Sequence, residues 1–454
     1  MDLMKIKKAH IIGIEGAGTS ALARILKYSG VEVSGSDEGD HFFNSVLADE
    51  GMSISHEFNP KNIPEDADMV VYGSSFRPET NDELKAAFES GKQVVTYAEA
   101  LAGIFNNKYG IAVSGTHGKT TTSALLAEAM RSCGMDPSAI IGGKVINWGG
   151  NSMIGKSEFF VAETDEYQNK LRLYEPKAAV LTSCDYDHPD FFLTFADYKK
   201  AFSDFVARIP KFGFLVVWGD STDTLEVAKS AACDVLTYGF SEDCNYKINK
   251  KESGAFEIIR NGESLGEFSV GLVGNHNILN AAAVVAVCHK LKLDMEKVQE
   301  ALWNFKGTSR RFELIGERNG AILIDDYAHH PEEIKATLKA AREKYPEKNI
   351  IAVFHPHTFT RTKALLQEFS QSFDSADSVI VIDIYGSARE AQGGVSSKEL
   401  VDLINTYSRG KAEHIPTIPE AIESLKDKIG PDDIIISIGA GNVWEVTKDL
   451  GNNS

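Results

Sequence analysis

YGIAVSGTHGKTTT, residues 109–122, is the stretch that decides the fold of this 454-residue chain. It begins as an apolar strand, turns at Gly115 and Gly118, and leads into a helical pattern over residues 123–132. A glycine turn lets backbone N–H groups point into one concavity, and the helix N-terminus adds the positive end of its dipole. The stretch therefore predicts a phosphate loop, in which Lys119 reaches the β- and γ-phosphates of a nucleotide and Thr120 ligates Mg²⁺.

The spacing of this loop leaves one alternative. Fewer residues separate its glycines than in the common G-x-x-x-x-G-K-[ST] pattern, so a coincidental glycine turn is the competing interpretation. The strand directly before the loop and the helix directly after it favour nucleotide binding. Such a loop is typical of kinases, motors, GTPases and ligases alike, so the reaction has to be decided by other residues.

Strand and helix patterns alternate on both sides of the loop. Apolar runs at 9–14, 31–35, 68–73 and 92–96 precede it, and runs at 157–163, 178–183 and 212–220 follow. A third series lies at 321–327, 349–354, 378–384 and 433–439. Alternation of this kind is typical of parallel α/β sheets, whereas residues 245–270 have short strands and polar turns that indicate a small antiparallel flap.

This pattern predicts an α/β protein of three domains. A Rossmann-like domain over residues 1–107 comes first, and a central P-loop domain with a mostly parallel sheet and the flap spans 108–311. A second Rossmann-like domain covers 312–454. The length fits, because domains average roughly 150 residues.

Composition and charge exclude several classes of partner. A formal net charge of -18 argues against nucleic acid and anionic membranes, which need a basic surface. No apolar run approaches the ~20 residues that span a bilayer, and the N-terminus lacks a secretory pattern, so a cytoplasmic location is expected. The five cysteines are scattered without metal-finger spacing, so we expect reduced and mostly buried thiols.

Two polar residues follow strands that neighbour the phosphate loop in the chain. Glu163 ends the run 157–163, and His188 comes shortly after the run 178–183. Parallel strands deliver such residues to one sheet edge, where a carboxylate and an imidazole can hold Mg²⁺ beside a triphosphate. A hydrogen-bonded loop histidine is the alternative for His188. Further acidic residues of these segments are equally typical of a solvated surface and rank below Glu163; they are Asp165, Glu166, Asp185 and Asp187.

The first domain carries a second glycine-rich turn. Gly13, Gly16 and Gly18 follow a strand and open a helix, and Asp37 ends the next strand, as in a dinucleotide-binding fold. An NAD-dependent dehydrogenase is therefore one interpretation. Glu15 disfavours it, because this position should let a pyrophosphate approach. The diphosphate of another nucleotide could use the same helix N-terminus, and the glycines could also serve packing alone.

Several separated motifs, in order and over nearly the whole chain, resemble the Mur ligase family. They include IGIEGAG (12–18), YGSSFRPETN (72–81), the loop GTHGKTTT (115–122), AETDE (162–166), DYDHPDFF (185–192), GNHNILNAAA (274–283), GTSRRFE (307–313), DDYAHHPEE (325–333), FHPHTFTRT (354–362) and GAGNVW (439–444). The resemblance implies an ATP- and Mg²⁺-dependent ligase that forms an acyl phosphate and then an amide in peptidoglycan precursor synthesis. Its substrates would be UDP-N-acetylmuramate and L-alanine, with a tripeptide in place of L-alanine as the alternative.

The resemblance also implies roles for individual residues. ATP would be bound by Gly115, Thr116, His117, Gly118, Lys119, Thr120, Thr121, Asn277, Asn280, Arg311 and Asp326, and the metal by Thr120, Glu163 and His188. The UDP-sugar would contact Gly16, Ala17, Gly18, Asp37, Ser74 and Ser75, and the amino acid Tyr327, His329, His357 and Arg361. Catalysis would fall to Lys119, Glu163, His188, Arg311 and His330.

Some residues depart from the family pattern or admit another interpretation. Glu15 replaces a frequent glycine, Gln168 an acidic residue, and Thr358 an arginine, which affects how strictly L-alanine is selected. For His329 and His330 the alternative is a polar pair at a helix start, before Pro331. A non-catalytic nucleotide-binding module is disfavoured, because binding alone does not need Glu163, His188 and Arg311 together. We expect a monomer or a homodimer.

Overall fold

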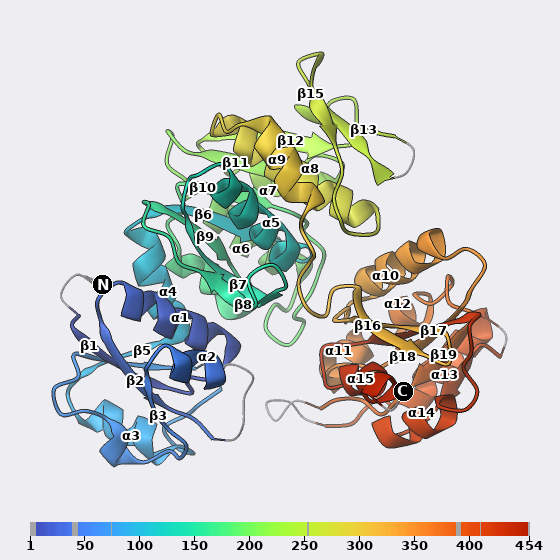
Figure 1. Ribbon diagram of the computed structural model, residues 1–454, viewed down its shortest axis with the longest axis horizontal. Helices are drawn as coiled ribbons and strands as arrows, with labels where there is room; N and C mark the ends of the chain where they lie inside the picture. The colour runs from blue at the N-terminus through green and yellow to red at the C-terminus, as the bar shows by residue number, and fades with distance from the viewer. Residues whose placement is uncertain are drawn as a thin grey trace.

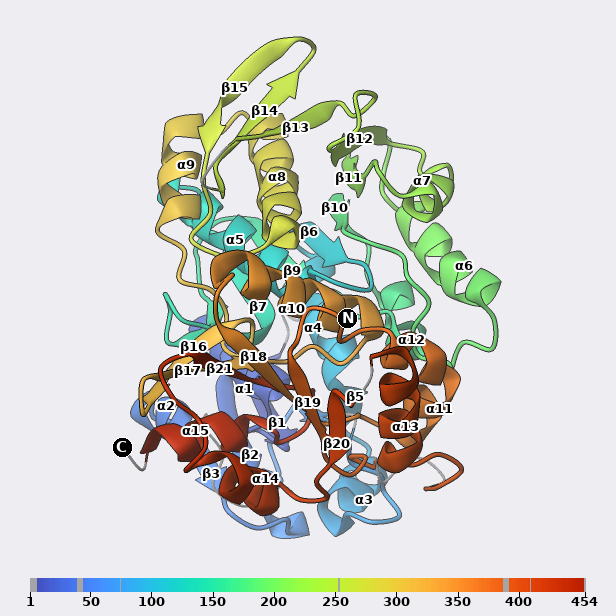
Figure 2. The ribbon, with the colours of Figure 1, turned by 90° about the vertical axis from the view of Figure 1, so that its right-hand side faces the viewer.

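The computed structural model describes residues 6–38, 44–73, 75–251, 254–386, 392–408 and 410–452. It contains three α/β domains, each built around its own sheet, which Figure 1 shows as three lobes in blue, green to yellow, and orange to red. A view from the side shows the C-terminal lobe in front of the N-terminal lobe and below the central lobe (Figure 2). The predicted α/β fold with three domains is confirmed.

The N-terminal domain has a five-stranded parallel sheet in the order β3-β2-β1-β4-β5. Its central strand β1 leads through a glycine turn into α1, which packs Leu22 and Leu26 on the sheet. Helix α4 then runs toward the central domain. The elements are β1 (Lys8–Ile12), α1 (Ala17–Tyr28), β2 (Glu32–Ser36), α2 (Asn44–Asp49), β3 (Ser53–Ser55), η2 (Pro60–Asn62), β4 (Met69–Tyr72), α3 (Asp82–Glu89), β5 (Gln93–Thr96) and α4 (Tyr97–Asn106).

The central domain has a ten-stranded sheet in which β6 lies between β9 and β10. The predicted flap is antiparallel, and it extends the main sheet because β13 pairs with β12. The strands are β6 (Tyr109–Ser114), β7 (Ser138–Val145), β8 (Gly150–Met153), β9 (Phe159–Glu163), β10 (Ala178–Leu181), β11 (Phe214–Trp218), β12 (Asp234–Gly239), β13 (Tyr246–Lys250), β14 (Phe256–Arg260) and β15 (Glu263–Phe268). The helices are α5 (Lys119–Ser132), η3 (Tyr167–Leu173), α6 (Phe195–Val206), α7 (Thr222–Ala228), α8 (Asn275–Lys290) and α9 (Met295–Trp303).

The C-terminal domain has a six-stranded sheet in the order β16-β17-β21-β18-β19-β20. Its edge strand β16 is antiparallel to β17, and a turn at Asn319 and Gly320, both at positive φ, joins them. The strands are β16 (Glu313–Arg318), β17 (Ala321–Asp326), β18 (Asn349–Phe354), β19 (Ser378–Val381), β20 (Ala412–His414) and β21 (Asp433–Ile438). The helices are α10 (Pro331–Lys344), α11 (Phe359–Ala364), α12 (Leu366–Ser370), α13 (Ser397–Tyr407), α14 (Ile418–Leu425) and α15 (Trp444–Asn452).

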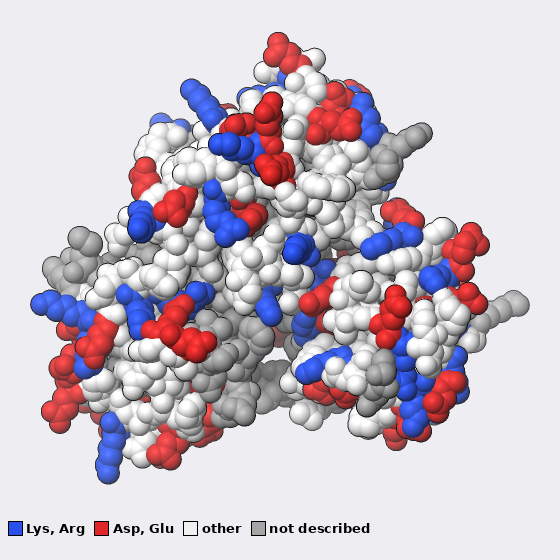
Figure 3. All heavy atoms as spheres, viewed as in Figure 1, with Lys and Arg blue, Asp and Glu red and all other residues white. Residues whose placement is uncertain are grey.

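The surface and the cysteines match the composition. On the face in Figure 3, basic side chains are scattered among acidic ones. All five cysteines are free thiols, and Cys184, Cys244 and Cys288 are buried. Within the described part of the chain, no helix has the length and apolar character needed to cross a membrane.

Candidate active site

The phosphate loop joins β6 to α5 and needs glycine at two positions. Gly115 has φ +129° and Gly118 has φ +80°, which are left-handed conformations that other residues rarely adopt. A Cβ at Gly115 would lie 2.3 Å from Thr182 Oγ1, and one at Gly118 would lie 2.6 Å from Asn280 Oδ1. The loop is therefore packed tightly against β10 and α8, with the N-terminus of α5 at its end.

Lys119 begins α5 and turns back over the loop. Its Nζ donates to the carbonyl oxygens of Gly115 (2.5 Å) and Thr116 (3.1 Å), and to Glu166 Oε2 at 3.0 Å. Burial lowers the pKa of Lys119, but Glu166, Asp165 and Glu163 outweigh burial and raise it. The lysine is therefore a half-buried cation at the start of a helix, which suits phosphate.

A cavity of about 260 Å³ lies between the central and the C-terminal domains. Trp218, Tyr238 and Leu272 give it apolar walls at one end, and the phosphate loop forms the other. Of the residues predicted to bind ATP, eight line it: His117, Gly118, Thr120, Thr121, Asn277, Asn280, Arg311 and Asp326. An apolar slot that ends at a phosphate loop has the form of a nucleotide site. The cavity is also lined by Glu333 of the C-terminal domain.

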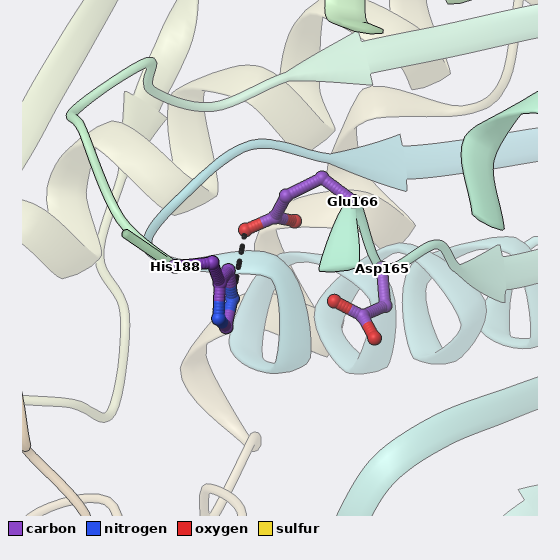
Figure 4. Close-up of side chains that lie close together, drawn as sticks. All are labelled: Asp165, Glu166 and His188. Atoms are coloured by element: carbon purple, nitrogen blue, oxygen red, sulfur yellow. Dashed lines mark ion pairs between the residues drawn. The ribbon is translucent and has the colours of Figure 1, made fainter. Parts of the chain in front are cut away.

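The predicted metal ligands fall into two adjoining groups. Thr120 Oγ1 donates to Glu163 Oε1 at 3.1 Å, and Glu163 Oε2 accepts from the Gly142 N–H at 2.7 Å. His188 Nε2 lies 3.7 Å from Glu166 Oε1. Figure 4 shows Glu166 reaching toward the His188 ring, with Asp165 beside it, and ligand atoms of these three residues lie within 4.8 Å of one another. Both groups offer the oxygen ligands that Mg²⁺ prefers.

A solvated surface position, which the sequence analysis allowed for Glu166, does not hold in the structure. Glu166 is 1% exposed and accepts from both Lys119 and the Tyr198 hydroxyl, at 3.0 Å each. A fully buried carboxylate with two donors is not a solvated surface charge. The sequence gives no local sign of this burial, because Tyr198 comes from α6.

The predicted amino-acid residues gather at the carboxyl edge of the C-terminal sheet. His329 Nδ1 donates to the Tyr327 carbonyl oxygen at 3.1 Å, and the ring of His357 lies 6.4 Å from that of His329. Burial lowers the pKa of His329 to about 3, and it also lowers the pKa of His330. Neither imidazole therefore adds positive charge there at neutral pH.

His330 lies at a helix start and also reaches the phosphate loop, so both interpretations of this residue fit its position. It is the N-cap of α10, where its Nδ1 accepts from the Glu332 N–H at 3.4 Å, as a polar residue at a helix start would. Its ring also lies 4.8 Å from that of His117 in the phosphate loop, and its buried Nε2 has no hydrogen-bond partner. The helix cap and the contact with the central domain are thus made by one side chain.

Glu333 links three predicted site residues, although the sequence did not single it out. Its carboxylate bonds His117 Nδ1 at 3.1 Å and the His329 N–H at 3.0 Å, and lies 3.9 Å from Arg311 Nη1. Burial raises the pKa of Glu333, but His329, His117 and Arg311 outweigh burial and hold it well below its usual range. The pKa of His117 is lowered by burial, but Glu333 outweighs this and raises it. An ion pair therefore crosses the nucleotide cavity.

Arg361 makes a second contact between the same two domains. Its Nε and Nη2 both donate to Asp187 Oδ1 at 3.0 Å, and Nη2 also donates to Asp187 Oδ2 at 3.2 Å. Asp187 precedes His188 in the central domain, and Arg361 lies on α11. The side chains are 7% and 8% exposed.

The N-terminal domain presents the start of α1 to the central domain. Gly16 is the N-cap of α1, and Asp37 accepts from the backbone N–H of Glu15 at 2.8 Å. Gly18 faces Tyr97, because a Cβ there would lie 2.6 Å from the tyrosine Cζ. Ser75 is exposed, Ala17 opens the helix, and Ser74 lies outside the described residues.

A second cavity, of about 510 Å³, connects the two domains. Gly18 and Tyr97 of the first domain line it, together with Lys119 and Glu163 of the central domain. Lys170 and Arg172 add basic side chains that the sequence analysis did not single out. A ligand lying along this cavity would extend from the glycine turn of the first domain to the phosphate loop of the second.

Of the three departures from the family pattern, only Gln168 lines one of these cavities. Gln168 lines the second cavity and has φ +57°, and Asn169 next to it has φ +54°. Thr358 has φ +66° and caps α11 by accepting from the Arg361 N–H at 3.4 Å. Glu15 is 1% exposed beneath the glycine turn.

Comparisons with known proteins agree with this geometry. Family models match three segments: "Mur ligase family, catalytic domain" over residues 8–109, "Mur ligase middle domain" over 113–288, and "Mur ligase, glutamate ligase domain" over 310–441. The UDP-N-acetylmuramate–L-alanine ligase of Caldanaerobacter subterraneus subsp. tengcongensis is 40% identical, over 98% of this chain and 97% of its own. That of Desulfitobacterium hafniense is 39% identical, over 97% and 98%.

A solved structure has the same fold. The UDP-N-acetylmuramate–alanine ligase of Thermotoga maritima superposes with a TM-score of 0.81 at 24% identity, covering 98% of both chains. The murein peptide ligase of Psychrobacter arcticus superposes with a TM-score of 0.74 at 23% identity, again over 98% of both chains.

Proposed function

The chain belongs to the Mur ligase family, and from this premise we infer that it is an ATP-dependent ligase that joins L-alanine to UDP-N-acetylmuramate. Relatives at 38–40% identity that bear this name match the chain over nearly its full length. The dehydrogenase interpretation of the first glycine turn is therefore replaced by that of a UDP-binding turn. Because ATP is the cosubstrate, we propose a cytoplasmic enzyme.

One structural observation supports the chemistry most directly. The phosphate loop lies where the two cavities meet: Thr120 lines the nucleotide cavity, and Lys119 lines the cavity that leads to the first domain. A nucleotide in one cavity and a sugar nucleotide in the other would meet beside Lys119. Such an arrangement serves transfer of a phosphoryl group between two bound substrates.

In the first step, a carboxylate oxygen of the sugar substrate attacks the γ-phosphorus of ATP. The new oxygen–phosphorus bond gives an acyl phosphate, and the bond to the β–γ bridging oxygen breaks to release ADP. Lys119 and Arg311 stabilise the negative charge on the transferred group, which is the main work of the protein in phosphoryl transfer.

The donor set fits Mg²⁺, which we propose as the bound metal. Thr120 and Glu163 would hold it on the side of the phosphate loop, and His188 with Glu166 and Asp165 forms an adjoining set. When bound, Mg²⁺ would neutralise charge on the phosphates. Glu166 already holds Lys119, so this carboxylate also keeps the lysine amine over the loop.

In the second step, the amino group of L-alanine attacks the carbonyl carbon of the acyl phosphate. A tetrahedral intermediate forms, its nitrogen gives up a proton to the departing phosphate, and the carbon–oxygen bond to phosphate breaks to leave the amide. Tyr327, His329 and His357 line the edge that would receive the amine. The uncharged imidazoles of His329 and His330 do not repel an ammonium group, which must reach this edge before it loses its proton.

The test is a coupled assay of ADP release with UDP-N-acetylmuramate as acceptor. We expect release with L-alanine, and mass spectrometry should show the amide product. Release with a tripeptide and not with L-alanine would instead identify the peptide-adding ligase. No ADP with any amine would contradict the proposal.

A further inference from the structure

We propose that Asp187 is a positioning residue that holds Arg361 to receive the α-carboxylate of the amino acid substrate. The inference rests on the proposed function, because it needs a substrate that brings a carboxylate next to its amine. The sequence left open a solvated surface position for Asp187, but its side chain is only 7% exposed. No other carboxylate is within hydrogen-bond distance of Arg361 among the described residues.

The geometry of the pair leaves one side of the guanidinium for a second anion. Asp187 bonds Nε and Nη2, which form one edge of the planar group, and Nη1 takes no part in the pair. Guanidinium groups bind carboxylates as a planar fork, and the edge with Nη1 and Nη2 can take another one. Asp187 thus fixes the plane and direction of the free edge.

Asp187 is itself held in place. Its Oδ1 accepts from the His188 backbone N–H at 2.7 Å, so the carboxylate cannot turn away from Arg361 without losing that bond. Thr358 holds the other partner, because its hydroxyl accepts from the Arg361 N–H. The pair thus connects the loop after β10 with α11, 174 residues further along the chain.

The location of the pair fits the substrate carboxylate. Arg361 comes four residues after His357, and the His357 ring lies 6.4 Å from that of His329, so the pair lies beside the edge proposed to receive the amine. An α-amino acid carries its amine and carboxylate on the same carbon, so the two must be bound by neighbouring groups. Arg361 is a cation next to that edge, and its buried partner Asp187 orients it.

The experiment compares L-alanine with L-alaninamide, which lacks the carboxylate, in Asp187→Asn and in the unaltered enzyme. We expect the KM for L-alanine to rise about tenfold or more in Asp187→Asn. A tenfold change corresponds to ~1.4 kcal/mol of binding free energy. The KM values for ATP and L-alaninamide should stay within about twofold, so the preference for L-alanine collapses. A merely structural role would raise all three.

Two further variants separate the alternatives. Asp187→Glu keeps the charge and protects folding, and should raise the KM for L-alanine less than Asp187→Asn does. Asp190→Asn removes the same charge from the same loop, where Asp190 accepts from the Tyr167 hydroxyl and, in the described part of the chain, has no hydrogen bond to Arg361. It should therefore raise that KM much less than Asp187→Asn does. With Arg361→Lys, the Asp187→Asn effect should largely disappear, because it acts through the guanidinium.

The outcomes are distinct. An unchanged preference for L-alanine over L-alaninamide in Asp187→Asn, or additive effects with Arg361→Lys, would overturn the inference. So would a rise in the Mg²⁺ concentration needed for half-maximal activity with an unchanged KM for L-alanine, which would assign Asp187 to the metal through His188. Failure of the unaltered enzyme to ligate L-alanine would contradict the proposed function instead.

Discussion

Lys119 is the single side chain on which the proposed chemistry depends most. It is a half-buried cation bonded to two loop carbonyls and to Glu166, so no other residue can take its place without rearrangement. We expect Lys119→Ala to lower kcat for ADP release by at least about a thousandfold, the upper range for loss of one stabilising group. Lys200→Ala is the matched control, because Lys200 is 70% exposed on α6. Near-normal turnover of Lys119→Ala would remove its assigned role.

His355 makes the stability of the protein depend on pH. Burial, helped by His357, lowers the pKa of His355 to about 4, below the usual 6.5. The unfolded chain therefore binds a proton between these values that the folded chain does not, so stability falls as pH drops from about 6.5 to 4. The loss from this group is on the order of 3 kcal/mol.

Urea unfolding at pH 7 and pH 4.5 measures this dependence. We expect His355→Gln to lose less stability between the two pH values than the unaltered protein. His414→Gln is the control, because His414 is paired with Asp383 near the surface. If His355→Gln and the unaltered protein lose the same free energy of unfolding between pH 7 and pH 4.5, other groups cause the loss of stability at acid pH.

Local sequence predicted some site residues and could not predict others. Gly115, Gly118 and Lys119 follow from a strand, a turn and a helix in one stretch, so their positions were predictable. Glu333 and Asp187 have their main partners 216 and 174 residues away. Such contacts form only when two domains meet, and a single sequence contains no periodicity that reports it.

At the level of elements, a glycine-to-alanine substitution tests how tightly the loop between β6 and α5 is packed. Gly118→Ala should lose about 1–2 kcal/mol from its left-handed backbone, plus the cost of moving Asn280 away from the new Cβ. Gly134, after the other end of α5, has φ +79° and nothing within 4 Å of a Cβ. Gly134→Ala should therefore lose only the backbone contribution.

Urea unfolding of both variants measures the difference in their free energy of unfolding. Titration calorimetry measures their affinity for ATP. We expect weaker ATP binding in Gly118→Ala alone. If both variants lose the same stability and bind ATP equally well, the contact of the loop with α8 is unimportant.

Some strands at the sheet edges were missed. The central parallel strands were recognisable as apolar runs between helices, and the antiparallel flap was predicted too. Strand β16 was missed because it is an edge strand whose residues are all exposed or half-buried, and Leu314 is 64% exposed. The turn at Asn319 and Gly320 was the available signal, since this dipeptide is typical of hairpins. The bends in η3 at Gln168 and Asn169 had no comparable signal.

At the scale of the whole molecule, Glu333 joins the C-terminal domain to the phosphate loop. We expect Glu333→Gln to lower kcat by about ten- to a hundredfold, equal to ~1.4–2.8 kcal/mol, because His117, Arg311 and His329 lose a common anion. Small-angle scattering should also show a more open average shape. Glu343→Gln is the control, since Glu343 is exposed on the same helix α10. Unchanged turnover and shape would exclude this role.

The segment between the central and the C-terminal domains is also a wall of the nucleotide cavity. Arg310 and Phe312 have φ of +63° and +52°, and Thr308, Arg311 and Phe312 line the cavity. A rotation of the C-terminal domain therefore changes the walls of the nucleotide cavity. If a small molecule bound at this segment changes the affinity for ATP by some factor, ATP must change the affinity for that molecule by the same factor. A molecule that weakens ATP binding from this segment would thus oppose ATP without occupying the ATP site.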